Sequence, residues 1–456
     1  MLPFLKPTSK HISILLILII TATVLKFQPW QNAEQDGALI NWDVTSYYAY
    51  LPATFIEDDL SLQFVEKDSS YYWDNHRYWP QEAPNGAKVI KTTMGLSILY
   101  APFFALGHQY AQIQDDESRG FSSTYEFFLV LSSLFYMIIG VFCLRKFLLY
   151  FYNDLTVAIT LATIYLGTNL FYYETIEPIL SHGYNFALIS SLLLLTVKWH
   201  QKPSWKFTSM IGLVAGLIIL IRPVNVFIIL FFILYQLFEK DGFKTKSKLF
   251  KKEYLKLGTI ALISFIVILP QLLYWHSMTG HFFFNSYVGE QFYFNNPHVI
   301  DGLFSYRKGW LLYTPIMILA LIGIFFSKGF KYTILLIIAP VILVLFSWWN
   351  WWYGGSFGCR PIIDFYPLLA IGMAAFIQKI TETKKVFKAS TGVLIVLLVC
   401  FNLFQTIQRK SDAIHWDSMT KEAYWHNFLS RYAQPGFEKT LQAPNNKKAL
   451  KGEDEY

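Results

Sequence analysis

The sequence predicts an all-α integral membrane protein: a polytopic helical bundle of about eleven transmembrane helices, with a long first outer loop that carries juxtamembrane helices. Two observations predict this class. The 456 residues are 54% hydrophobic and 18% aromatic but only 15% charged, a composition that does not suit a soluble globule of this length. The apolar residues also gather in runs near the ~20 residues that cross a bilayer.

The charged residues exclude other classes of protein. The net charge of +7 does not indicate nucleic-acid binding, because the lysines lie between apolar runs, where they would set membrane topology. The three cysteines are too few and too scattered for a disulfide framework or a cysteine-based metal site.

The first element is an uncleaved helix at 12–27, which follows Lys6 and Lys10 and therefore starts in the cytoplasm. The polar and aromatic segment 28–94 is too long for a connector. Tyr71-Tyr72-Trp73 and Tyr78-Trp79-Pro80 mark turns and interfacial pieces within it.

The apolar run 96–111 poses a topological choice, because it either crosses the membrane or lies at its surface. If it does not cross, all the basic clusters of the later loops fall on the side of the N-terminus, as the positive-inside rule requires. Gly95, Pro102 and Gly107 also favour a short or broken interfacial helix over a straight span. We therefore expect a re-entrant or juxtamembrane helix, which makes 28–123 the first outer loop.

The crossing helices are then expected at 12–27, 124–147, 155–173, 183–199, 207–222, 224–239, 257–276, 310–327, 332–348, 364–380 and 387–408. An odd number of crossings places the end of the chain outside. The sequence thus divides into a transmembrane domain, 1–408, and a small outer-face C-terminal tail, 409–456.

Charged residues on this outer face depart from the charge bias of the inner loops. Cations near lipid need an anionic partner to offset their desolvation, and a phosphate is such a partner. The alternative is that the cations extend to lipid headgroups. The residues concerned are Asp43, Lys88, Lys91, Glu174, Glu177, His182, Arg222, Arg307, Lys308 and Arg360.

Several of these residues lie in stretches that resemble the GT-C membrane glycosyltransferases, and more closely the branch of dolichyl-phosphate-mannose protein mannosyltransferases and the lipid A aminoarabinose transferase. The similarity runs over about 12–408. It is carried by an acid in the first outer loop, by Gly86-Ala-Lys-Val-Ile-Lys91-Thr-Thr-Met-Gly-Leu, by Ser181-His182, and by Ser347-Trp-Trp-Asn-Trp-Trp-Tyr-Gly-Gly-Ser-Phe-Gly-Cys-Arg360, which is the most specific piece.

The resemblance implies a mannosyl- or aminoarabinosyl-transferase-like enzyme of the bacterial inner membrane. It would move a sugar from a polyprenyl-phosphate donor to a hydroxyl of a glycan, lipid or protein acceptor on the periplasmic face. Asp43 matches the catalytic acid of the family, and a carboxylate there suits a base for the attacking hydroxyl. Lys91 matches the residue that meets the donor phosphate, with Lys88 as a second choice. Arg360, after its glycines, is the other expected phosphate ligand.

Five further residues are expected to contact substrate: His182, Glu177, Tyr47, Arg222 and Trp352. Alternatives stay open for some of them. A histidine at this place also caps a helix, and the cluster of Trp348, Trp349, Trp351 and Trp352 suits an aromatic belt as well as a sugar-stacking surface.

The use of a metal is undetermined, and no cofactor is certain. Many members of the family carry a second acid beside the first, whereas Asp43 lies between Trp42 and Val44. A metal-bridging scheme would need Glu174, Glu177 or Asp36. A divalent metal therefore stays open.

Two rival functions remain. A lipid or glycan transporter or flippase also combines many spans with ionisable residues, but it usually shows internal repeats and charges near the midplane, which this sequence lacks. An O-antigen-ligase or polymerase-like transferase would also act on the outer face, but this alternative offers no stretch that matches the tryptophan-rich motif.

Overall fold

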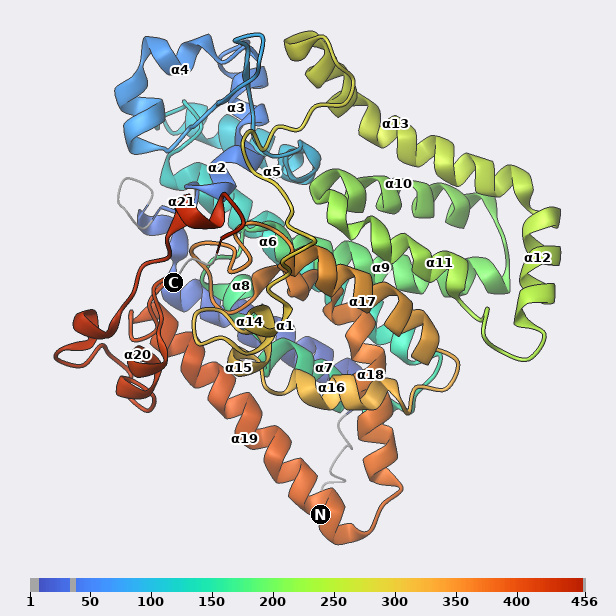
Figure 1. Ribbon diagram of the computed structural model, residues 1–456. Helices are drawn as coiled ribbons and strands as arrows, with labels where there is room; N and C mark the ends of the chain where they lie inside the picture. Colours follow the sequence, from blue (N-terminus) through green and yellow to red (C-terminus); the bar gives the residue numbers. More distant parts are fainter. Residues whose placement is uncertain (1–7, 33–37, 454–456) are drawn as a thin grey trace.

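The computed structural model describes residues 8–32 and 38–453 and is helical almost throughout (Figure 1). Within these ranges the sole β-sheet is an antiparallel pair, β1 (Gln81–Glu82) and β2 (Lys88–Val89), in which Gln81 faces Val89. The expectation of an all-α protein is therefore confirmed.

Five helices in the described part of the chain are long and apolar enough to cross a membrane, so the protein is an integral membrane protein, while the expected count of eleven spans is not confirmed. These five begin with α1 (Ser9–Phe27), which continues into η1 (Pro29–Asn32). The others are α6 (Ser123–Leu148), α13 (Tyr254–Thr279), α18 (Tyr366–Thr381) with its lead-in η4 (Arg360–Phe365), and α19 (Lys385–Lys410).

Three of the expected spans are interrupted. The run 155–173 forms α7 (Asp154–Leu166) and α8 (Leu170–Thr175), and 310–327 forms α15 (Trp310–Tyr313) and α16 (Met317–Ile324). The run 224–239 forms η3 (Pro223–Ile229) and α11 (Leu230–Leu234). Gly167 and Pro315 lie at the first two breaks, as residues that weaken or end helices. The remaining runs form α9 (Ser181–Gln201), α10 (Trp205–Ile221) and α17 (Lys331–Phe346).

The segment between α1 and α6 carries short helices: α2 (Asp43–Tyr48), α3 (Tyr50–Phe55), α4 (Gln63–Lys67) and the π-helical η2 (Ser70–Asn75). It ends with α5 (Gly95–Ile113), which is continuous through Pro102. The expectation that this helix is short or broken is therefore wrong, because packing along α6 outweighs the cost of one proline. Helix α5 is absent from the five long apolar helices, and its place at the membrane surface stays a prediction.

The core lies around α9 and α18, against which α6, α7 and α16 pack. The apolar stretch of α18 is 94% buried, whereas those of α13 and α19 are only 17% and 6% buried, so the latter two present their surface to lipid. Helices α16 and α18 approach so closely that a methyl group at Gly323 would lie 1.8 Å from the carbonyl oxygen of Gly372.

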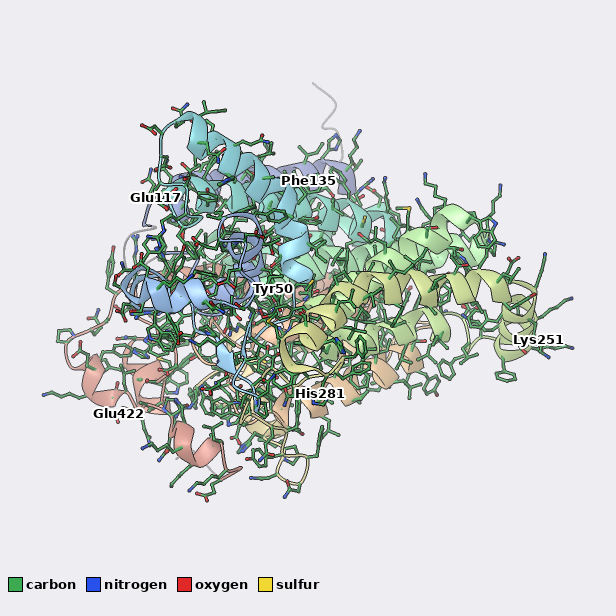
Figure 2. The ribbon with its side chains drawn as sticks, turned by 90° about the horizontal axis from the view of Figure 1, so that it is seen from above. Tyr50, Glu117, Phe135, Lys251, His281 and Glu422 are labelled. Carbon is green, nitrogen blue, oxygen red and sulfur yellow. The ribbon has the colours of Figure 1, made fainter. Side chains whose placement is uncertain are left out.

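The two ends of the bundle differ in character. The basic helix α12 (Gly242–Lys252) lies at one end, and α2, α4 and the C-terminal tail lie at the other (Figure 1). Seen from above, Lys251 marks the first end, and Glu117 and Glu422 mark the second (Figure 2). The assignment of these two ends to an inner and an outer face stays a prediction.

The tail contains α20 (Lys421–His426), η5 (Phe437–Thr440) and α21 (Asn446–Ala449). It folds back onto the loops that follow α13, α14 (Val299–Phe304) and α17. Two buried cations fasten it. The guanidinium of Arg307 donates to the carbonyl oxygens of Asp417 (2.9 Å) and Gln442 (3.1 Å). The ammonium of Lys308 donates to those of Ser356 and Trp416. The membrane side of the tail stays a prediction.

Candidate functional site

Asp43 is the first residue of α2, and its position depends on an unusual backbone conformation at Trp42. Trp42 has φ 50° and ψ −121°, a region that residues with a side chain rarely adopt. The turn is closed by the amide of Val44, which donates to the carbonyl oxygen of Asn41 (3.0 Å). On the other face of α2, the buried Tyr48 donates to the carbonyl oxygen of Gly120 (2.6 Å). Helix α2 is thus anchored from behind, and Asp43 faces outward.

The carboxylate of Asp43 forms an ion pair and hydrogen bond with the guanidinium of Arg360. The Asp43 side chain is 53% exposed and that of Arg360 14%. Burial within the surrounding structure raises the pKa of Asp43, but the charge and hydrogen bond of Arg360 outweigh this effect. With smaller contributions from Lys91 and Arg222, the pKa lies below its ordinary value. Asp43 is therefore ionised at neutral pH.

Lys91 is paired with a residue that the sequence analysis did not identify, Glu290. The other carboxylate oxygen of Glu290 accepts a hydrogen bond from the indole nitrogen of Trp349 (2.8 Å). The ammonium of Lys91 also lies 5.0 Å from the ring centre of Tyr287. Glu290 therefore joins the lysine to the tryptophan-rich motif.

The backbone around Lys91 is held on both sides. The amide of Ile90 donates to the hydroxyl of Tyr274 on α13 (3.0 Å), and the amide of Met94 donates to the side chain of Gln271 (2.8 Å). At Gly95 an added methyl group would lie 2.5 Å from the backbone nitrogen of Ile221, so only glycine lets α5 begin against the end of α10. This contact brings the segment of Lys91 close to the segment of Arg222.

A second carboxylate, Asp364, lies fully buried in η4, the element that begins at Arg360, and the sequence analysis did not identify it. It draws together residues of three elements. His182 Nδ1 lies 2.8 Å from its Oδ1, and Oδ2 accepts hydrogen bonds from the amides of Asn185 (3.0 Å) and Asn225 (2.8 Å). Arg222 Nη1 lies 3.8 Å from Oδ2. Because Asp364 lies four residues after Arg360 in the 3-10 helix η4, it ties the position of Arg360 to α9 and η3.

Arg222 and Tyr47 complete the arrangement around Asp43. Arg222 Nη1 lies 3.3 Å from His182 Nδ1, and its charge contributes to the lowered pKa of Asp43. Burial raises the pKa of Tyr47, opposed by Arg222, so this phenol stays protonated and able to donate a hydrogen bond. The structure thus brings together Asp43, Arg360, Lys91, Arg222 and Tyr47.

The loop before Arg360 is shaped by its glycines and anchored from two sides. Gly354 and Gly358 have φ of 59° and 62°, which glycine adopts without strain. The amide of Phe357 donates to the hydroxyl of Tyr173 on α8 (2.7 Å), and the amide of Ser356 donates to the tail carbonyl of Trp416 (3.1 Å). The tail therefore supports the loop that delivers Arg360.

The other expected residues are placed differently. Lys88 pairs with Glu66, and Glu177 accepts a hydrogen bond from Tyr172 (2.7 Å). Trp352 is only 1% exposed and packs against Trp349 and Trp351, which describes a core residue in this conformation. Its contact with substrate stays a prediction.

The candidates for a second acid were Glu174, Glu177 and Asp36, of which the structure describes the first two. Both carboxylate oxygens of Glu174 are buried without a hydrogen-bond partner in the described ranges, and Asp36 lies outside them. Across residues 8–32 and 38–453, no group of three or more histidine, cysteine, aspartate or glutamate side chains is arranged to hold a metal ion. Metal use stays open.

No protein-family model and no curated protein sequence matches this chain. Among solved structures, the chain is similar to the archaeal oligosaccharyltransferase AglB from Archaeoglobus fulgidus in complex with an inhibitory peptide and a dolichol-phosphate. The TM-score is 0.52 at 12% sequence identity, over 98% of this chain and 60% of that chain. The chain therefore shares the fold of this oligosaccharyltransferase, while membership of the GT-C enzymes and of their mannosyltransferase and aminoarabinose transferase branch stays a prediction.

Proposed function

We propose that the protein is a glycosyltransferase that moves a sugar from a polyprenyl-phosphate donor to an acceptor hydroxyl at the outer face of the bacterial inner membrane. The observation that carries this proposal is the Asp43 carboxylate paired with Arg360 and lying within the field of Lys91 and Arg222. The proposed base, Asp43, thus lies beside the cations proposed to bind the donor phosphate. The shared fold with an oligosaccharyltransferase solved with a dolichol-phosphate supports it.

In the proposed reaction, the acceptor hydroxyl donates a hydrogen bond to Asp43 and attacks the anomeric carbon. The bond between that carbon and the phosphate oxygen breaks, and the electron pair leaves with the polyprenyl phosphate. The hydroxyl proton passes to Asp43. A carboxylate of low pKa is a weak base, so it takes the proton late, when an oxocarbenium-like transition state has made the attacking oxygen acidic. Direct displacement by the acceptor oxygen, with a single carboxylate acting as base, predicts inversion at the anomeric carbon.

The cations stabilise the leaving phosphate. In this structure Arg360 and Lys91 each pair with a carboxylate, Asp43 and Glu290. A donor phosphate provides several charged oxygens and competes for these partners, and a planar guanidinium binds two such oxygens at once. Negative charge that accumulates on the phosphate as the sugar departs then meets donors already in position.

The test is to purify the chain from its membrane and to identify co-purifying lipid-linked sugars by mass spectrometry. Wild-type protein is expected to carry a polyprenyl-phosphate sugar, and a Lys91→Gln/Arg360→Gln double variant is expected to lose it. Incubation with an acceptor should then release free polyprenyl phosphate. Recovery of the intact lipid-linked sugar, moved across a bilayer without cleavage, would instead establish a flippase.

A further inference from the structure

We propose that Trp42, Trp73 and Trp79, together with Arg77, form a stacking surface for a pyranose ring of a glycan acceptor. This inference rests on the proposed function and names the acceptor class that the site would take. The three tryptophans, here called the indole surface, are 61%, 46% and 37% exposed. Trp42 is the chain neighbour of Asp43, about 3.8 Å away between Cα atoms. A sugar held there would place its hydroxyls beside the base.

The three indoles form one continuous surface. Trp42 and Trp79 meet edge to face, with ring centres 4.8 Å apart and planes at 79°, and Trp73 lies 6.4 Å from Trp79. The guanidinium carbon of Arg77 lies 5.8 Å and 6.0 Å from the ring centres of Trp42 and Trp79. The axial C–H groups of a pyranose are attracted to the negative face of an indole, and a guanidinium beside it donates to ring hydroxyls.

The exposure of the tryptophans is selective. In the same segment Tyr72 and Tyr78 are buried, at 1% and 2% exposed, and Tyr78 donates to the carbonyl oxygen of Ala49 (2.7 Å). The tyrosines therefore anchor the segment, while the tryptophans face outward. The hydroxyl of Thr45 on α2 also donates to the carbonyl oxygen of His76 (2.9 Å), which fixes the segment to the helix of Asp43.

Backbone strain coincides with the indole surface. Trp42 and Arg77 both have positive φ, 50° and 53°, although neither is glycine. Such conformations cost of order 1–3 kcal/mol each and persist where the surrounding structure imposes them, often at binding sites. At Trp42 this conformation turns the indole away from the core that receives Val44. The strain thus serves the exposure of the ring beside Asp43.

A membrane interface is the other use of exposed tryptophans. The surrounding segment carries a net negative charge, even though Glu66 and Asp68 pair with Lys88 and Arg119. An anionic headgroup layer repels such a segment, whereas a glycan does not. The charged residues of the segment 57–79 are Glu57, Asp58, Asp59, Glu66, Lys67, Asp68, Asp74 and Arg77, six acids against two bases. The charge of this segment therefore favours a glycan over lipid as the occupant.

The test uses the full chain in lipid nanodiscs, which avoid sugar-based detergents, applied to an array of immobilised bacterial glycans. We expect binding to at least one glycan series. Trp73→Ala and Trp79→Ala are each expected to weaken it about tenfold, the change that corresponds to about 1.4 kcal/mol. Trp205→Ala is the matched control, because Trp205 is 56% exposed at the start of α10 and lies beside Lys256, which follows the basic helix α12. If Trp79→Ala lowers the melting temperature, its loss of binding could reflect unfolding, and the glycan binding of Trp73→Ala then decides whether the indole surface binds the sugar.

Absence of glycan binding, or binding that both substitutions leave intact, would overturn the proposal. Fluorescence quenching by brominated lipids provides a second readout: quenching that falls in Trp73→Ala would assign the indole surface to the membrane. Undecaprenyl phosphate in the same nanodiscs separates this test from that of the proposed function. Wild type and Trp73→Ala should bind it alike, whereas failure of the wild type to bind it would count against the donor, not against the indole surface.

Discussion

The carboxylate of Asp43 accepts a hydrogen bond from the guanidinium of Arg360, 317 residues further along the chain. This pair links the proposed base to the proposed phosphate ligand. A donor phosphate that takes the guanidinium leaves Asp43 with less positive charge beside it, which raises the pKa of that carboxyl. The base would then become stronger when the donor arrives.

The first prediction concerns pH. Arg360→Gln removes the main influence that lowers the pKa of Asp43, so this pKa rises. Since the proposed reaction requires ionised Asp43, the acidic limb of the profile of kcat/KM against pH should move to higher pH. Lys91→Gln is the control, because Lys91 contributes less to the pKa of Asp43 and should move the limb by a smaller amount. An acidic limb that stays in place in Arg360→Gln would separate Asp43 from the pH dependence.

The second prediction concerns Asp364. Asp364→Asn leaves Arg222 without its buried counter-charge, and loss of one partner from such a pair costs about 3–5 kcal/mol of unfolding free energy. We expect a lower melting temperature and a higher KM for the lipid donor in the protein that remains folded. The double variant Asp364→Asn/Arg222→Gln removes both charges and should recover part of the stability. An Asp364→Asn chain with wild-type melting and donor KM would show that Asp364 positions nothing.

The third prediction concerns topology. Asp115 follows α5, and Thr245 lies in α12 at the other end of the bundle (Figure 1). Cysteines introduced at these positions, in a background with the exposed Cys400 replaced by serine, should react with a membrane-impermeant reagent from opposite sides of the membrane. Labelling of both from the same side would mean that 96–111 crosses the bilayer and that the active face is wrongly assigned.

The fold class could be predicted from the sequence because it depends on composition and on apolar runs, which are local properties. The interruptions of the spans were not predicted, although Gly167 and Pro315, which weaken or end helices, are visible in the sequence. An apolar run has the same hydropathy whether its helix is continuous or broken. Neighbouring helices decide this, and they are far away in the sequence.

The site was partly predictable for a related reason. Asp43, Lys91 and Arg360 each depart from the local charge pattern, so each could be singled out alone. Their partners could not be paired, since Lys91 and Glu290 lie 199 residues apart. Asp364 could have been singled out, because a carboxylate between Ile363 and Phe365 in an apolar stretch indicates a functional residue. It was instead counted as the first residue of the expected span 364–380.

The last prediction concerns Asp43 itself. Asp43→Asn keeps the shape of the side chain and removes its charge, so a base at this position predicts a folded protein that still binds lipid donor. Its turnover should fall by roughly 10²–10⁴, the contribution of a positioned general base.

If Asp43 instead only begins α2 and pairs with Arg360, the substitution should lower the melting temperature and leave the rate per folded molecule near that of the wild type. Melting and rate are measured independently, so the two roles separate. A folded Asp43→Asn variant that transfers sugar at more than about a tenth of the wild-type rate would remove Asp43 as the base. The role would then pass to Glu177, whose carboxylate lies within the field of Arg360, or to Glu174.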